Sequence, residues 1–280
     1  MKRFLCRTLS LFLIFVIAFS GVFVINRCIK LNKPLTLTVG SYNVMHGMMA
    51  NFDMSKIAEN IVSSDLDIVG LQEINQRTKR VNGMDMMKEL SEESGYPYYA
   101  FFKAMPLQGG EYGIGILSKY PIISTRTVML ESGDKEPRVM GCAEIDVDGH
   151  IINFFVTHLS YESKDIRDEQ FEQIADELVE YDDFILVGDF NTRDFDSYDV
   201  IEDSDMVNDH DESVVTFPEN NSSIDNIVFS DDDWDFSSPD RVTDQSYSDH
   251  YMLYATGTYL GDREFEFSDV VEDMSEFIDQ

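Results

Sequence analysis

The sequence predicts a mixed α/β sandwich, and three observations support this prediction. Short apolar or alternating stretches, which are typical of strands, recur between residues 35 and 259. Stretches with helical spacing of apolar residues lie between some of them. Asp148-Gly149 separates two of the apolar stretches and is a strong signal for a tight hairpin. Strands joined partly by hairpins and partly by helices favour layered, mixed sheets.

The elements of the first half follow from local patterns. Residues 35–39 alternate between apolar residues and threonine, as a half-buried strand does. Ile57 and Ile61 have helical spacing, so we expect a helix at 55–63. The other elements expected here are a strand at 67–71, a helix at 84–94, an aromatic strand at 96–102 and a strand at 114–117.

The second half contains the clearest helix, at 166–181, where Phe171, Ile174 and Leu178 share one face. Apolar stretches predict the remaining strands at 143–147, 151–156, 184–187, 224–229 and 251–259. No repeat and no Pro/Ser/Gly-rich linker divides residues 34–260, so we expect one large domain there. An acidic tail is expected to follow at 261–280.

Residues 1–33 have a different composition. The run from Thr8 to Asn26 is uncharged and mostly apolar, with three basic residues on each side. At about 1.5 Å per helical residue, it nearly spans a bilayer core of about 30 Å. We favour an uncut membrane anchor, because the apolar run continues past the candidate signal-peptide cleavage site, Ala18-Phe19-Ser20. We therefore expect an anchored, extracytoplasmic domain, or a secreted one if the leader is cleaved.

The charge balance bears on the substrate. Six of the 21 basic residues and none of the 53 acidic residues lie in 1–33, which leaves a formal charge near −38 for the rest. A protein that binds DNA neutralises phosphates with Lys and Arg. An acidic surface therefore disfavours extended nucleic acid, unless the source organism simply has acidic proteins.

Six short polar groups follow apolar stretches. The most informative is Gly188-Asp189-Phe190-Asn191, where a carboxylate and a carboxamide stand just past a strand. Side chains at strand ends can converge on one cleft and hold a water, a cation or a phosphate oxygen. The other five groups are Ser41-Tyr42-Asn43, Leu71-Gln72-Glu73, Thr157-His158-Leu159, Ile224-Asp225-Asn226 and Ser248-Asp249-His250.

Three of these residues suit a divalent cation. Glu73 and Asp249 supply carboxylates, and Asn43 supplies a neutral oxygen. Mg²⁺ prefers oxygen ligands and needs only one or two carboxylates from the protein. We therefore expect Mg²⁺, or Mn²⁺, at this site.

The other residues suit hydrolysis of a phosphoester. Asp189 is placed to orient or deprotonate a water, and Asn191 to hold a phosphate oxygen. His158 and His250, when protonated, stabilise charge on the phosphate oxygens. Asp225 is a candidate to fix the tautomer of His250.

The order of these motifs resembles the endonuclease/exonuclease/phosphatase superfamily, the DNase I-like hydrolases. The motifs span nearly all of residues 36–259 in the family's order. The matching segments are SYNVMHG (41–47), LQEI (71–74), YGIGILSKYPI (112–122), PRVM (137–140), FFVTHLS (154–160), VGDFNT (187–192), SSIDNIV (222–228) and YSDHYML (247–253).

This resemblance implies a four-layer sandwich of two mixed β-sheets flanked by helices. It also implies a metal site of Asn43, Glu73 and Asp249, a catalytic group of Asp189, Asn191, Asp225 and His250, and a phosphate contact from His158. Glu111 or Tyr112 is expected beside His158. Arg138 either contacts the substrate phosphate or bridges to an acid, while His46 has no firm role.

We expect a metal-dependent phosphoesterase that is monomeric and acts on a small or lipid-linked phosphomono- or diester near the bilayer. The first alternative is a tethered or secreted nuclease, which plasmid nicking would reveal. The second is a catalytically silent binding protein on the same fold. The presence of every carboxylate and histidine of the motifs argues against that second alternative.

Overall fold

The computed structural model describes residues 35–209, 214–231, 233–243 and 247–260. The leader expected at 1–33, with its hydrophobic helix, and the acidic tail at 261–280 lie outside these residues. Thr36–Tyr259 form one compact unit. Among the described residues, no helix is long and apolar enough to cross a membrane.

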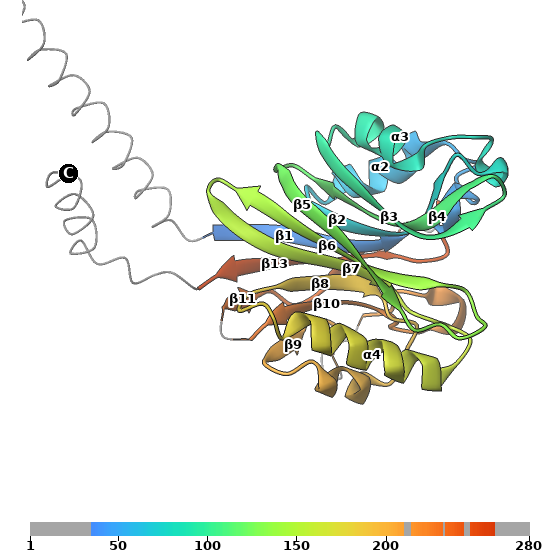
Figure 1. Ribbon diagram of the computed structural model, residues 1–280. Coiled ribbons are helices and arrows are strands. Elements are labelled where there is room, and N and C mark those ends of the chain that lie inside the picture. Colours follow the sequence, from blue (N-terminus) through green and yellow to red (C-terminus); the bar gives the residue numbers. More distant parts are fainter. Residues whose placement is uncertain (1–34, 210–213, 232, 244–246, 261–280) are drawn as a thin grey trace, which may run out of the picture. The chain divides into compact units, whose positions relative to one another are not determined.

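Two mixed β-sheets make up this unit (Figure 1). Sheet A has the order β11 (Trp234–Phe236), β13 (Met252–Tyr259), β1 (Leu35–Asn43), β2 (Ile68–Gln76), β4 (Gly110–Ser118) and β3 (Tyr98–Leu107), and β12 (Asp240–Val242) pairs with β13. Sheet B has the order β5 (Ile122–Leu130), β6 (Arg138–Val147), β7 (His150–His158), β8 (Ile185–Asp189), β10 (Asp225–Ser230) and β9 (Ser204–Met206).

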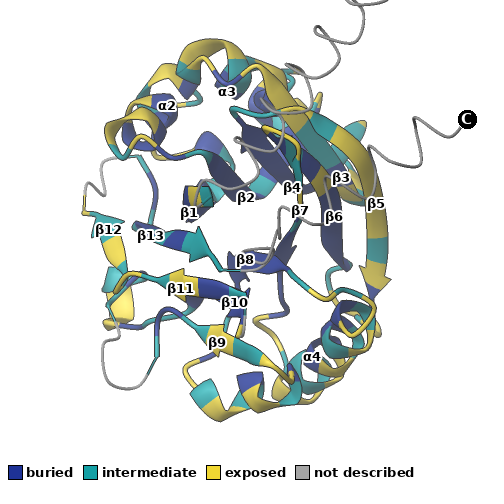
Figure 2. Ribbon diagram, turned by 90° about the vertical axis from the view of Figure 1, so that its left-hand side faces the viewer, coloured by how far each residue is buried: buried dark blue, intermediate teal, exposed yellow. Residues whose placement is uncertain are grey.

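Helices cover the outer face of each sheet, which gives four layers (Figure 2). The helices α2 (Met54–Ser63) and α3 (Met86–Ser94) pack on sheet A, and α4 (Lys164–Leu178) packs on sheet B. Asp53, Asp85 and Ser163 cap these helices, each accepting a hydrogen bond from a backbone N–H of the first turn. The sandwich expected from the sequence is confirmed.

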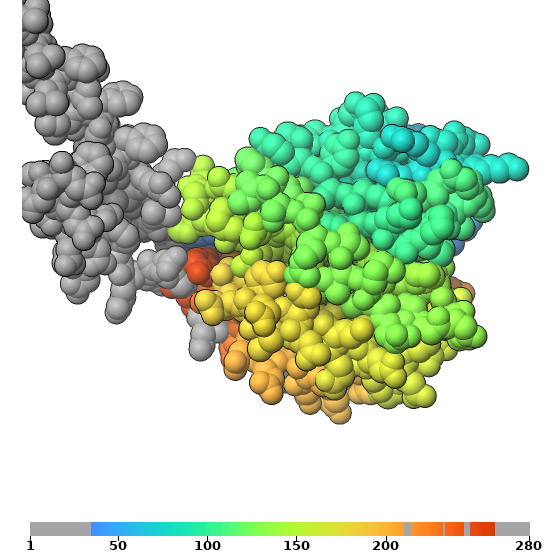
Figure 3. All heavy atoms as spheres, viewed as in Figure 1, coloured from blue at the N-terminus to red at the C-terminus, as the bar shows by residue number. Residues whose placement is uncertain are grey.

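The edge of sheet B also contacts α4. Figure 3 shows atoms of β5 (green) adjoining those of α4 (yellow). Arg126 of β5 makes an ion pair with Glu177 of α4 and donates a hydrogen bond to the Tyr181 hydroxyl at 3.0 Å.

Two parallel strand pairs bring the polar groups to one end of the sandwich. The pair β1–β2 is connected through α2, and the pair β7–β8 through α4. Because parallel strands end at the same edge, Asn43 lies beside Gln72, and His158 lies beside Asp189. The antiparallel strand β10 then places Asp225 opposite Asp189.

The inner faces of the sheets pack closely at Gly70. A Cβ added to this glycine would lie 2.3 Å from Cγ2 of Val187 and 2.8 Å from Cγ2 of Val156. The side chains of Val156 and Val187 therefore point between the sheets. Because side chains alternate along a strand, His158 and Asp189, two residues further on, point between the sheets as well.

Most expected elements are confirmed, but the long strand β5 and the three-residue strands β9, β11 and β12 are missing from the sequence prediction. The omission of β5 has a physical reason. Its residues are largely exposed from Ile122 to Val128, so they lack the alternation that marks a half-buried strand. Five predicted strands, β1, β2, β4, β7 and β8, are also longer in the structure than in the prediction. The prediction used apolar residues alone, so it left out the polar residues at the ends of these strands.

Candidate active site

Asp189 lies at the centre of the converging strand ends. It is 1% exposed, and side chains from both sheets surround it. Nδ2 of Asn43, from sheet A, donates a hydrogen bond to Oδ2 of Asp189 at 3.0 Å. The same oxygen lies 3.4 Å from Nε2 of His158 and 3.6 Å from Nε2 of His250. Three of the residues predicted for the site thus surround the same carboxylate oxygen of Asp189.

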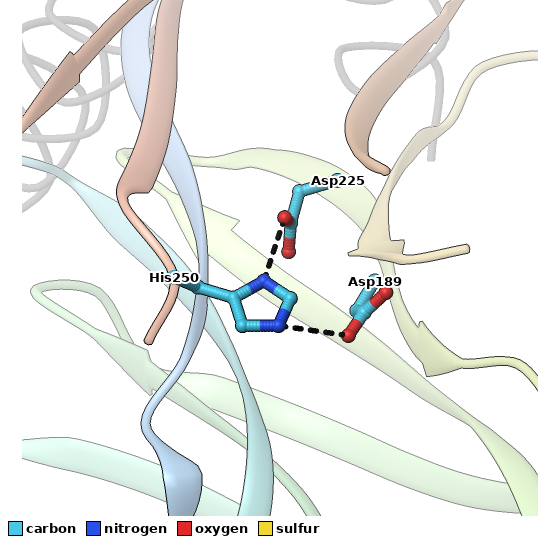
Figure 4. Close-up of side chains that lie close together, drawn as sticks. All are labelled: Asp189, Asp225 and His250. Atoms are coloured by element: carbon cyan, nitrogen blue, oxygen red, sulfur yellow. Dashed lines mark hydrogen bonds and ion pairs between the residues drawn. The ribbon is translucent and has the colours of Figure 1, made fainter. Parts of the chain in front are cut away.

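His250 and Asp225 form a buried pair (Figure 4). Nδ1 of the imidazole lies 2.8 Å from Oδ2 of Asp225, and Nε2 points toward Asp189. Burial opposes the charged imidazolium, but the carboxylates of Asp225 and Asp189 outweigh it and raise the pKa of His250 to about 10. The ring of Phe217 lies against His250, with ring centres 4.9 Å apart. His250 is therefore a fixed cation at neutral pH.

Asp189 has the opposite tendency, toward the neutral acid. Burial and the negative charge of Asp225 raise the pKa of Asp189 to about 7. The His250 charge and hydrogen bonds from Asn43 and from the backbone N–H of Asn191 oppose this shift. A carboxylate whose pKa lies near the working pH suits general base catalysis.

His158 differs from His250 in its charge state. Burial, together with the positive charges of Arg138 and His250, lowers the pKa of His158 well below its ordinary value. The expectation that both histidines are protonated is therefore wrong for His158, because no carboxylate compensates its burial sufficiently. As a neutral imidazole, His158 can still donate one N–H. Its Nδ1 is buried and has no hydrogen-bond partner among the described residues.

Asn191 is held in a strained position after β8. Its φ is 52°, in the left-handed region that asparagine tolerates better than most residues. One N–H of its carboxamide donates to the carbonyl oxygen of Leu159 at 3.0 Å. Among the described residues, the second N–H of this carboxamide has no other hydrogen-bond partner, and the expected contact of Asn191 with a phosphate oxygen stays a prediction.

A β-bulge directs Glu73 into the cleft. The pairing of β2 with β4 shifts register between Leu71 and Ile74, and Glu73 has a φ of 62°. Bulges next to functional sites commonly redirect a side chain. Oε2 of Glu73 lies 3.0 Å from Nδ1 of His46, which itself has a φ of 43°. His46 therefore orients Glu73, a role that the sequence did not reveal.

Electrostatics support a cation beside Glu73. Burial of its carboxyl raises the pKa of Glu73, but the hydrogen bond and charge of His46, with the charges of His250 and Arg80, bring it below its ordinary value. Burial raises the pKa of Asp249, and the negative charge of Glu73 raises it further. The positive charge of His250 lowers this pKa but does not cancel the increase. The charge of Glu73 disfavours the charged form of Asp249, and a cation beside these carboxylates would offset that repulsion.

The oxygen donors fit a hard divalent ion. Glu73 and Asp249 supply carboxylates. Oδ1 of Asn43 accepts a hydrogen bond from the Met45 N–H at 3.0 Å, which uses one of its two lone pairs and leaves the other for an ion. Ser248 fixes the Asn43 backbone by donating to its carbonyl oxygen at 2.6 Å. An all-oxygen set suits Mg²⁺ or Mn²⁺. Asp189, Asp225 and His250 also have ligand atoms within 4.8 Å of one another, but an imidazole that is protonated has no lone pair for a metal ion.

A cleft of about 510 Å³ opens at this end of the sandwich, and six of the predicted catalytic and metal-binding residues line it, whereas Asp225 and Asp249 are not among its lining residues. The six are Asn43, Glu73, His158, Asp189, Asn191 and His250. Tyr112 lines it, with the guanidinium of Arg80 5.2 Å from the centre of its ring. Arg138 also lines the cleft and is 3% exposed, and its Nη1 lies 3.1 Å from Oε1 of Glu136. Glu111 is not brought to the cleft, because it pairs with Lys103 across the hairpin at 2.7 Å. Of the expected pair, Tyr112 alone lies at the site.

Sequence reasoning missed three cleft residues that carry positive charge. They come from η2 (Lys79–Val81), from α4 and from the loop after β8, and they are Arg80, Arg167 and Arg193. The position of Arg193, two residues after Asn191, is the one signal that pointed to the cleft. The other two meet the cleft only through the tertiary fold.

Comparison with known proteins agrees with this geometry. Residues 40–250 match the model of the Endonuclease/Exonuclease/phosphatase family. No curated protein sequence matches the chain. The chain is similar to a solved endonuclease/exonuclease/phosphatase from Beutenbergia cavernae, with 20% identity and a TM-score of 0.67 over 80% of this chain and 72% of that one.

Two further solved structures share the fold. One is the mannosyl-6-phosphatase of Bacteroides thetaiotaomicron, with 20% identity and a TM-score of 0.56 over 78% of this chain and 98% of that one. The other is D. rerio TDP2 in complex with a single-strand DNA product, with 17% identity and a TM-score of 0.62 over 79% and 98%.

Proposed function

The chain belongs to the endonuclease/exonuclease/phosphatase family of phosphoester hydrolases. On that premise, we propose that it is a Mg²⁺- or Mn²⁺-dependent phosphoesterase that acts on a small or lipid-linked phosphoester. The observation that carries the proposal is the contact of Asp189 with Asn43, His158 and His250, which come from both sheets. This arrangement supports a mechanism in which a base, a charged imidazole and hydrogen-bond donors act around one point of the cleft.

Asn43, Glu73 and Asp249 would hold the divalent ion. When bound, the ion polarises the phosphoryl group and neutralises its developing negative charge. Their fit rests on the carboxylate pair of Glu73 and Asp249 and on the contact of His46 with Glu73.

Asp189 would orient a water and take its proton as the water attacks phosphorus. Its pKa near 7 allows it to accept a proton at neutral pH. His250, held as a cation by Asp225, would stabilise charge on a phosphoryl oxygen. The neutral His158 and the free N–H of Asn191 would donate hydrogen bonds to the same phosphoryl group.

The size of the cleft supports a small substrate or head group. A volume of about 510 Å³ lies in the range of about 300–1,000 Å³ that small-molecule sites occupy. The uncharged run from Thr8 to Asn26 supports a tether that would keep the catalytic domain near a membrane, outside the cytoplasm. The excess of 53 acidic over 21 basic residues disfavours a long polyanion.

A nuclease is the second candidate, because arginines line the cleft and a relative of the same fold binds a DNA product. A substrate panel separates the two candidates. The full chain, with Mg²⁺ or Mn²⁺, is given p-nitrophenyl phosphate, bis-p-nitrophenyl phosphate, phosphatidylinositol vesicles and supercoiled plasmid. We expect the small or lipid esters to be hydrolysed faster than the plasmid is nicked. Faster nicking at low salt would contradict the proposed substrate class.

A further inference from the structure

The distribution of arginine in the described residues is uneven. These residues contain seven arginines, and Arg80, Arg138, Arg167 and Arg193 line the one cleft of about 510 Å³. No lysine lines it, although the whole chain carries a formal charge of −32. A guanidinium presents a rigid fork of donors that matches the oxygens of a phosphate. The cleft therefore carries positive charge that the average surface of this protein lacks.

Two of the four arginines belong to the hydrolytic end of the cleft. The charge of Arg138 acts on His158, and Arg80 lies over the ring of Tyr112 and acts on Glu73. Arg138 already pairs with Glu136. These two arginines are therefore close to the phosphoryl group that would react.

The other two arginines, Arg167 and Arg193, have no carboxylate partner within ion-pair distance among the described residues. Each is followed in the sequence by an aspartate, but both aspartates turn away to Lys164. Nζ of Lys164 lies 2.8 Å from Oδ1 of Asp168 and 3.5 Å from Oδ2 of Asp194. The nearest acids in the sequence thus pair with a lysine and leave both guanidinium groups without a carboxylate partner among the described residues.

The orientation of Arg167 is fixed although its charge is not neutralised. Its Nη1 donates to the carbonyl oxygen of Ser160 at 2.9 Å, just after β7. Arg193 is exposed and lines the same cleft, two residues after Asn191. Tyr161, which is 67% exposed, also lines the cleft. Arg167, which is oriented, partly buried and without a carboxylate partner among the described residues, is suited to an anion from outside the chain, and Arg193 supplies a second guanidinium at the same cleft.

We propose that Arg167 and Arg193 bind a second phosphate of the substrate, so that the preferred substrate is a small organic molecule with two phosphate groups. The phosphate that reacts lies at Asp189 and His250, and the second one lies at the α4 side of the cleft. The exposed ring of Tyr161 would contact the organic part. This inference rests on the proposed phosphoesterase function and names the class of its substrate.

Steady-state kinetics with a matched pair of substrates tests the proposal. The full chain with Mg²⁺ is given glucose 6-phosphate and glucose 1,6-bisphosphate, with p-nitrophenyl phosphate as a substrate that has no second anion. We compare wild type with Arg167→Gln and Arg193→Gln. Arg126→Gln is the control, because Arg126 contacts α4 outside the cleft.

We expect wild type to prefer the bisphosphate at least tenfold in kcat/KM. Each cleft variant should raise KM for the bisphosphate about 10- to 100-fold, because a charge-assisted hydrogen bond contributes about 1.5–3 kcal/mol. KM for glucose 6-phosphate and for p-nitrophenyl phosphate should change less than threefold in these variants. Arg126→Gln should have the same kinetic constants as wild type on all three substrates. Equal loss on all substrates, or no preference for the bisphosphate, would overturn the proposal.

Binding to a slowed variant separates this proposal from the catalytic one. In Asp189→Asn with Mg²⁺, calorimetry should give tighter binding of glucose 1,6-bisphosphate than of glucose 6-phosphate, and adding Arg193→Gln should remove the difference. If wild type hydrolyses no phosphoester but this difference persists, the function proposal fails and the second phosphate site stands. If a short single-stranded oligonucleotide binds more tightly than the bisphosphate through the same arginines, the small-molecule assignment is wrong.

Discussion

Replacing Asp225 with Asn should destabilise the protein in a way that depends on pH. A pKa of about 10 for His250, against an ordinary 6.5, corresponds to on the order of 5 kcal/mol in favour of the charged imidazole. Part of this stabilisation of the charged imidazole comes from Asp189, which remains in the variant. Asn keeps a neutral hydrogen bond worth about 1 kcal/mol. We therefore expect Asp225→Asn to lower the free energy of unfolding by about 3 kcal/mol at pH 6.

The sign follows from the direction of the shift. Because the folded pKa of His250 is raised, its contribution is fully present below pH 6.5 and disappears as pH rises through about 10. The difference between wild type and Asp225→Asn should therefore shrink to about 1 kcal/mol at pH 10.5, where His250 is neutral in both proteins. Asp189 also titrates in this range, and because the charge of Asp225 contributes to its raised pKa, part of the difference at pH 6 comes from Asp189. The change in the difference between pH 8 and pH 10.5 therefore reports His250.

Urea unfolding in EDTA at pH 6, 8 and 10.5 measures this difference. Trp234 is the single tryptophan and is 4% exposed, so its fluorescence reports unfolding. Asp235→Asn is the matched control, since Asp235 is exposed on β11, and we expect a change below about 0.5 kcal/mol. A difference between wild type and Asp225→Asn that stays constant from pH 6 to pH 10.5 would refute the assignment of an ionised His250–Asp225 pair.

Two further predictions concern the metal site and the packing of the sheets. His46→Asn, which tolerates the positive φ but does not reach Glu73, should weaken activation by Mg²⁺ about 10- to 100-fold while kcat at saturating Mg²⁺ changes little. A Mg²⁺ titration of activity checks this, and an unchanged midpoint would contradict the role of His46. Gly70→Ala should destabilise the fold by about 1–3 kcal/mol, because the new Cβ would lie 2.3 Å from a methyl group of Val187. Thermal unfolding followed by circular dichroism checks this, and an unchanged Tm would show that the sheets separate more easily than their packing suggests.

Local patterns in the sequence were sufficient to predict a mixed α/β sandwich and most residues of the candidate site. Apolar stretches predict strands, and a polar group directly after a buried strand lies at its end whatever the rest of the chain does. Asp189, Asp225 and His158 were found in this way, and pairing of neighbouring strands brings them together.

Features that depend on tertiary structure were beyond these patterns. The bulge at Glu73 places a non-glycine residue at positive φ, which no local pattern marks. The charge of His158 depends on Arg138, which belongs to a neighbouring strand. Arg167 reaches the cleft from a helix whose pattern revealed its apolar face alone. Net charge averages over the whole chain, so it gave no sign of the four arginines that line the cleft.

The most direct test of the account is metal-dependent hydrolysis of bis-p-nitrophenyl phosphate by wild type and Asp189→Asn. We expect EDTA to abolish wild-type activity and Mg²⁺ or Mn²⁺ to restore it. The variant, which lacks the base, should have a kcat about 10²- to 10⁴-fold lower at saturating metal. Activity that persists in EDTA, or a variant as active as wild type, would contradict the assignment of Asp189 and its neighbours as a metal-assisted hydrolytic site.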